Sequence, residues 1–93
     1  MAIKQYSLNF EFYYNLAKCY KQLGKTNEKL AEYKSLQEKN PIASVMVGLL
    51  EEQNGDKRKA ITTLDNFAMS EPDLIITSAV KKHIKELVKN IDN

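Results

Sequence analysis

The chain has 93 residues, which is enough for one small domain and too few for two hydrophobic cores. Apolar residues form 43% of it and charged residues 28%, and this ordinary globular usage argues against disorder and against a fibrous repeat. Fourteen basic and twelve acidic residues leave a net charge of +2, too small to hold nucleic acid or an anionic membrane by net charge alone.

Two helices are predicted in the first half of the chain. From about residue 8 to 23, aromatic and aliphatic side chains recur every three or four residues, which is the period of one helical face. Thr26 is expected to cap a second helix, in which the same period continues. This helix must stop before Pro41, because the residue that precedes a proline is pushed out of the α region.

Three further helices are predicted in the second half. Pro41 suits the first turn of the third helix, which is expected to reach about residue 53, and Asp56 is expected to cap the fourth. Pro72 is expected to open the fifth helix, over about 72–91. One face of the fifth helix is rich in lysine. Its opposite face is an apolar stripe made of Ile76, Val80, Ile84, Leu87, Val88 and Ile91.

The turn residues repeat at a fixed interval. Gly24 and Gly55 are 31 residues apart, and so are Pro41 and Pro72. An interval in this range is typical of stacked helical pairs, each of which needs the next one to cover its apolar face. The interval therefore predicts a helical solenoid, and the apolar stripe of the fifth helix suits a cap on its open end.

The segment 13–24 resembles the first helix of a tetratricopeptide repeat. The aromatic, aliphatic, small and glycine positions of that helix are matched in spacing by Tyr13, Leu16, Ala17, Tyr20 and Gly24. A second unit resembles the family more weakly, through Val47, Gly48, Gly55, Ala60, Leu64, Phe67 and Pro72. In this second unit Glu51 stands where the family has a tyrosine.

The resemblance implies one all-α domain over 1–93 that forms a right-handed α-solenoid. The expected divisions are a first repeat over about 8–41, a second over about 41–72 and a C-terminal capping helix over about 72–91. The opening residues resemble the end of a preceding repeat, which leaves open that the chain is a fragment of a longer repeat protein.

Catalytic and metal-binding chemistry is not indicated. Cys19 and His83 are the single cysteine and histidine, so neither has companions at metal-ligand spacing. Cys19 is expected on a buried face, and His83, which falls among lysines, is expected to be an ordinary solvent-side residue. Motifs of phosphate-binding loops and metalloproteases do not occur. We therefore expect no enzyme activity, no metal and no cofactor.

The resemblance also implies a peptide-binding concave surface, which in this family is lined mainly by the first helix of each pair. A polar wall beside an apolar floor suits a ligand with a large apolar side chain next to a polar or acidic group. The alternative is that the fifth helix or a further repeat covers the apolar floor. The wall would consist of Glu11, Tyr14, Asn15, Lys18, Lys21 and Gln22, and the floor of Ile42, Val45, Met46, Leu49, Glu52 and Gln53.

These features predict a non-enzymatic protein–protein interaction module or scaffold, with a partner of unknown identity. One alternative is a peripheral membrane or acidic-surface binder that uses the lysines of the fifth helix, and another is self-association through exposed terminal helix faces. Binding of nucleic acid is not indicated, because the aromatic residues are not interleaved with the lysines. No signal peptide or membrane-spanning stretch is recognisable, so a soluble, cytoplasmic chain is expected.

Overall fold

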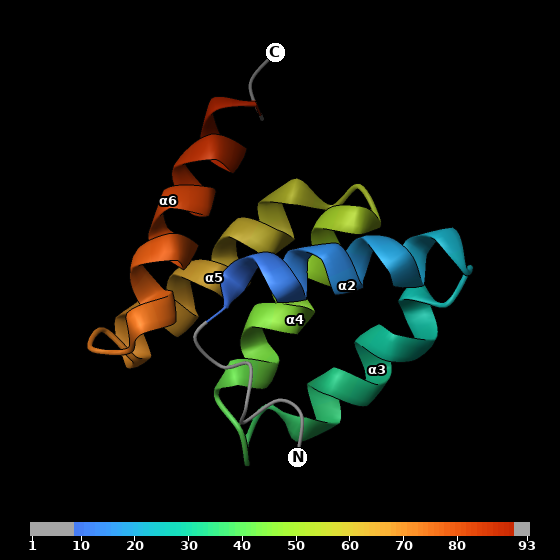
Figure 1. The fold of residues 1–93 in the computed structure, drawn as a ribbon, viewed down its shortest axis with the longest axis horizontal. Coiled ribbons are helices and arrows are strands. Elements are labelled where there is room, and N and C mark those ends of the chain that lie inside the picture. The colour runs from blue at the N-terminus through green and yellow to red at the C-terminus, as the bar shows by residue number, and fades with distance from the viewer. Residues whose placement is uncertain (1–8, 91–93) are drawn as a thin grey trace.

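Five α-helices make up most of the part of the chain that the computed structural model describes, residues 9–90. They are α2 (Phe10–Gln22), α3 (Thr26–Leu36), α4 (Ile42–Gln53), α5 (Lys57–Ser70) and α6 (Ile75–Lys89) (Figure 1). No strand occurs within residues 9–90. The prediction of an all-α fold is therefore confirmed, and the helix packing is consistent with a helical repeat.

The helix starts differ in detail from the sequence prediction. Asn9 caps α2, where its Oδ1 accepts a hydrogen bond from the backbone N–H of Phe12 at 3.0 Å. Thr26 is the first residue of α3 rather than its cap. Asp56 occupies the cap position of α5, but its side chain makes no capping hydrogen bond. Pro72 does not open α6, because it lies in the turn that precedes the helix.

Glycines end α2 and α4 in the same way. Gly24 and Gly55 have φ angles of 71° and 84°, in the left-handed region where a Cβ is penalised. The N–H of Gly24 donates to the carbonyl of Lys21 at 3.0 Å, and that of Lys25 donates to the carbonyl of Tyr20 at 2.9 Å. An equivalent pair of hydrogen bonds closes α4. The prediction that these glycines end helices is confirmed.

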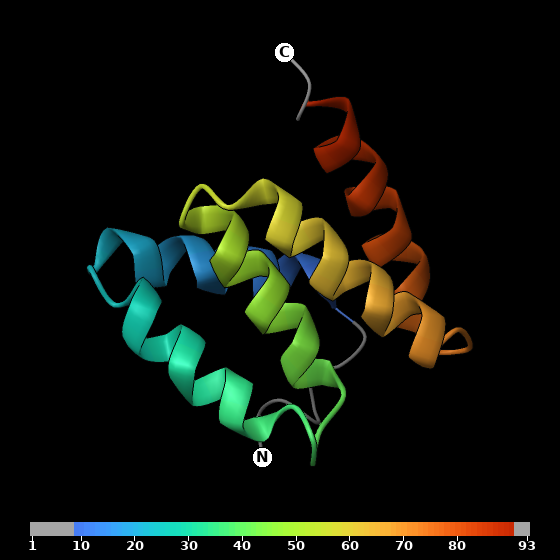
Figure 2. The ribbon, with the colours of Figure 1, turned by 180° about the vertical axis from the view of Figure 1, so that it is seen from behind.

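α4 is the central helix of the fold. It packs against α2, α3 and α5, whereas α6 packs mainly against α5 and also touches α2 (Figures 1 and 2). α2 and α3 contact each other little, so α4 holds the first predicted pair together. Because α4 has neighbours on several sides, it is buried over most of its circumference.

Two residues adapt α4 to its neighbour α5. Gly48 allows a close approach, since a Cβ at this position would lie 2.6 Å from Cδ2 of Leu64. Glu51 is only 4% exposed, and its Oε1 accepts a hydrogen bond from the hydroxyl of Thr63 at 2.6 Å. A small residue and a satisfied buried carboxylate thus replace the larger apolar side chains expected in a uniform core.

α6 covers one side of the core less evenly than predicted. Three residues of its apolar stripe are buried and join the same cluster as residues of α4 and α5; they are Ile76, Val80 and Leu87. Val88 is 50% exposed, so its predicted inward position is wrong. Ile91 lies outside the described residues. α6 therefore meets the core along a narrow face, which leaves an adjoining face turned towards α2.

Candidate functional site

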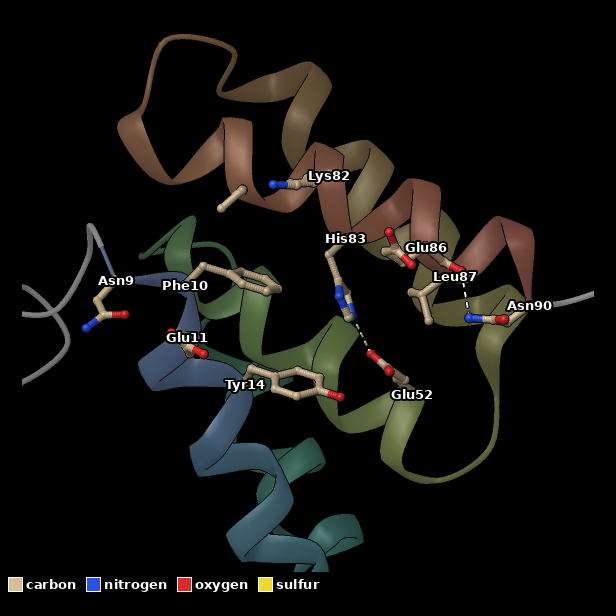
Figure 3. Close-up of a pocket in the computed structure, with 11 residues that line it drawn as sticks. Asn9, Phe10, Glu11, Tyr14, Glu52, Lys82, His83, Glu86, Leu87 and Asn90 are labelled. Carbon is tan, nitrogen blue, oxygen red and sulfur yellow. Dashed lines mark hydrogen bonds and ion pairs between the residues drawn. The ribbon is translucent and has the colours of Figure 1, made fainter.

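An open pocket of about 970 Å³ lies between α2 and α6, beside the C-terminal end of α4 (Figure 3). Its walls come from three helices that alternate along the chain. The lining residues are Asn9, Phe10, Glu11 and Tyr14 from the start of α2, Glu52 from α4, and Ala79, Lys82, His83, Glu86, Leu87 and Asn90 from α6 and its end.

Three rings form the middle of the pocket. Phe10 and Tyr14 project from α2 towards His83, which projects from α6 (Figure 3). The centroid of the His83 ring lies 5.2 Å from that of Phe10 and 5.3 Å from that of Tyr14. These separations fall in the range of favourable ring contacts, so the rings join the two walls.

A hydrogen bond fixes α6 to the end of α4. Nε2 of His83 lies 2.7 Å from Oε1 of Glu52, and the two side chains are only 15% and 14% exposed. Because a carboxylate can only accept, the ring nitrogen donates. His83 is therefore not an ordinary solvent-side residue, which corrects the sequence prediction. It orients the aromatic group and links all three helices of the pocket.

The charged groups around the rings are mainly acidic. Within residues 9–90, Glu11, Glu52 and Glu86 line the pocket together with one ammonium group, that of Lys82. Lys18 lies one turn further along α2, and its Nζ is 5.5 Å from the centroid of the Tyr14 ring. The pocket thus combines a ring cluster with an excess of carboxylates, although the chain as a whole carries +2.

The predicted polar wall is divided by the structure. Glu11 and Tyr14 line the pocket. The other four residues lie on exposed parts of α2 outside the pocket lining; they are Asn15, Lys18, Lys21 and Gln22. Lys21 reaches across to α4, where its Nζ donates to the backbone carbonyl of Gln53 at 2.8 Å. Gln53 does not line the pocket, so its side chain is not part of this site.

The predicted apolar floor is closed. Val45, Met46 and Leu49 are 0% exposed and Ile42 is 8% exposed, so their side chains are not accessible to a ligand in this structure. They pack in the core with Tyr13 of α2 and with apolar residues of α6. The row is covered mainly by the helices that pack on α4, which are α2, α3 and α5, and α6 joins the same apolar cluster. Of the predicted α4 row, only Glu52 lines the pocket.

Phe10, Lys82, His83 and Glu86 were missed as site residues. A signal existed on α6, because Ala79, His83, Glu86 and Asn90 recur every three or four residues beside the apolar stripe. The surrounding lysines hid this second face.

Reactive groups are sparse in the described part of the chain. Cys19 is exposed, which contradicts the expected burial. No group of three or more histidine, cysteine, aspartate or glutamate residues in the described chain could hold a metal ion. Burial raises the pKa of the Tyr13 phenol above its ordinary 10.0. Over the described residues, no helix is both long and apolar enough to cross a membrane.

Comparison with known proteins finds a family similarity in the N-terminal third of the chain. A model of the tetratricopeptide repeat matches residues 1–31, which include all of α2 and the start of α3. Searches of curated proteins and of solved structures gave no match. Tetratricopeptide repeats are in general protein–protein interaction modules without catalysis. The predicted resemblance is thus supported over residues 1–31, where the chain is similar to a tetratricopeptide repeat.

Proposed function

We propose that the chain is a non-enzymatic interaction module that holds a segment of a partner protein in the pocket between α2 and α6. The observation that carries this proposal is the convergence of α2, α4 and α6 on one pocket. In a solenoid of helical pairs, alternate helices line the same face. The pocket therefore lies where a concave binding surface is expected, with α6 in the place of the first helix of a further pair.

The make-up of the pocket supports a polypeptide ligand. Binding sites commonly combine aromatic surface with a few convergent polar groups, and an aromatic anchor dominates the binding energy of many interfaces. Here Phe10 and Tyr14 offer ring surface that is only partly buried in the free protein. Glu11, Glu86 and Asn90 supply polar groups at the rim. A partner side chain can bury the rings further without opening the core.

Affinity capture from the source organism with variants of the full chain tests this proposal. Tyr14→Ala removes a ring from the pocket, and losing such an anchor typically costs about 2 kcal/mol or more, so the captured amount should fall strongly. Lys85→Ala changes an exposed residue of α6 outside the pocket and should leave capture unchanged. Circular dichroism establishes that both variants are folded. Loss of capture with Lys85→Ala and retention with Tyr14→Ala would contradict the proposal.

That opposite result would favour an acidic surface as the partner. Lys81, Lys85 and Lys89 are exposed on α6 and remain available for such binding. Co-sedimentation with anionic vesicles separates this alternative from peptide binding, because attraction through lysines weakens as salt is added. Analytical ultracentrifugation tests self-association, since array ends with apolar faces can pair.

A further inference from the structure

We infer that the pocket between α2 and α6 accepts a cationic side chain of the partner, best an arginine. This inference rests on the proposed function and adds the chemistry of the ligand. It replaces the acidic option in the expectation of a polar or acidic group beside a large apolar side chain, for which Lys18 and Lys21 of α2 were the cationic candidates. Those lysines lie outside the pocket lining.

The charged side chains that line the pocket favour a cationic ligand. Glu11, Glu52 and Glu86 contribute three carboxylates, and Lys82 contributes one ammonium group. Among the described lining residues, the net charge is therefore −2 with a neutral His83 and −1 with a protonated His83. An acidic ligand would face this excess of like charge, whereas a basic ligand is complementary to it.

The aromatic rings of the pocket suit the guanidinium group of an arginine. A guanidinium group is planar, stacks on aromatic faces and binds a carboxylate through two parallel hydrogen bonds. Phe10 and Tyr14 provide the faces, and Glu86 lies beside His83 in the same pocket (Figure 3). Nζ of Lys18 already lies 5.5 Å from the centroid of the Tyr14 ring, so a guanidinium group that stacks on this ring must share it with Lys18 or displace that ammonium group.

Two of the three pocket carboxylates are available to pair with a cationic ligand. Oε1 of Glu52 is engaged by His83, so this residue mainly orients the ring cluster. Glu11 and Glu86 are exposed, and the salt bridges found among the described residues involve neither of them. Lys82 is the one lysine among the described lining residues, and it opposes a cationic ligand. Glu86 and Lys82 should therefore change the affinity in opposite directions.

Three matched pentapeptides with a central arginine, citrulline or glutamate test the inference against the ¹⁵N-labelled full chain. Citrulline has nearly the shape of arginine without its charge. The arginine peptide should shift the NMR signals of Phe10, Tyr14 and His83, with much weaker effects of the other two peptides. Equal binding of citrulline, stronger binding of glutamate, or arginine shifts outside the pocket would overturn the inference. If only the citrulline or the glutamate peptide shifted the NMR signals of the pocket residues, the preference for a cationic side chain would be rejected and the proposed function would stand.

Variants sharpen this test. Glu86→Gln should weaken the arginine peptide about twofold to fivefold, the scale of an exposed ion pair, and Lys82→Gln should strengthen it by a similar factor. Glu38→Gln is the matched control, because Glu38 is exposed and lies outside the pocket lining. An unchanged affinity with Glu86→Gln together with a weakened one with Lys82→Gln would refute the inference.

Discussion

α4 and α5 cross closely at Gly48. The effect of Gly48→Ala on the free energy of unfolding should therefore change sign when the neighbouring side chain of Leu64 is removed. A Cβ at this position would lie 2.6 Å from both Cγ and Cδ2 of Leu64 and 3.5 Å from the carbonyl oxygen of Ala60. Leu64 is 0% exposed and cannot turn into solvent. Gly48→Ala should therefore force a shift of the packed core.

Two opposing contributions determine the size of the effect. Overpacking of a tight core costs about 1–3 kcal/mol, whereas replacing a helical glycine by alanine gains roughly 0.5–1 kcal/mol. Gly48→Ala in the native chain should thus destabilise by up to about 2 kcal/mol. Gly48→Leu adds more atoms at the same place and should cost about 3 kcal/mol, which lowers Tm by roughly 12–24 °C in a domain of this size. Gln53→Leu, on a less buried position of α4, should cost far less.

Shortening the Leu64 side chain should reverse the sign of the effect of Gly48→Ala on stability. In a Leu64→Ala background the added methyl group meets free space, so Gly48→Ala should stabilise by roughly 0.5–1 kcal/mol through helix propensity alone. Urea denaturation followed by circular dichroism at 222 nm measures all four members of this cycle. Additive effects, or equal midpoints for Gly48→Leu and Gln53→Leu, would refute the assigned packing.

Three further predictions concern other parts of the fold. Thr63→Val should lower the free energy of unfolding by about 1–3 kcal/mol in a urea melt, because it leaves the buried Glu51 carboxylate without its hydroxyl donor. Thr62→Val on the exposed face of α5 should be nearly neutral, and equal losses for the two variants would contradict this role of Thr63. Burial and a hydrogen bond with a neighbouring tyrosine raise the pKa of Tyr33 above its ordinary 10.0, so the unfolded state ionises first. The contribution of Tyr33 to the free energy of unfolding should therefore be constant below pH 10 and fall above it. If Tyr33→Phe lost as much stability above pH 10 as the native chain does, Tyr33 would not be the cause of that loss. Truncation to 1–71 removes α6 and uncovers the core, so light scattering should detect aggregation and Tm should drop; a monomer as stable as the full chain would show that α6 is not a cover.

Local structure could be predicted well from the sequence. Helix ends at Gly24 and Gly55 follow from a backbone conformation that side chains disfavour, which is a property of single residues. The small residue Gly48 likewise marks a close approach wherever the neighbouring helix lies. The division of the chain into two repeats and a cap remains a prediction, since the family match covers only residues 1–31.

The site could be predicted only in part. Periodicity shows which face of a helix is apolar, but it does not show which other helix covers that face. Val45, Met46 and Leu49 therefore suited a groove floor as well as a core, and the packing of the neighbouring helices around α4 buries them in the core. Cys19 follows Phe12 at helical spacing on the edge of the apolar stripe of α2, where periodicity alone does not decide between burial and exposure.

His83 shows why the acidic pocket could not be predicted. Its neighbours in the sequence are lysines, so the local composition indicates a basic, solvated face. Its neighbours in space are Phe10, Tyr14 and Glu52, from helices that lie far away along the chain. Only the three-dimensional packing of α2, α4 and α6 brings these groups together, because none of the contacts is local.

Site-specific photo-crosslinking in the source organism tests the central claim most directly. A benzophenone amino acid in place of Tyr14 keeps an aromatic ring in the pocket, and the same group at the exposed positions Lys34 of α3 and Lys85 of α6 provides controls. A partner held between α2 and α6 should give a discrete protein adduct at position 14 and none at positions 34 and 85. An adduct at position 85 without one at position 14 would contradict the assignment of the pocket as the binding site.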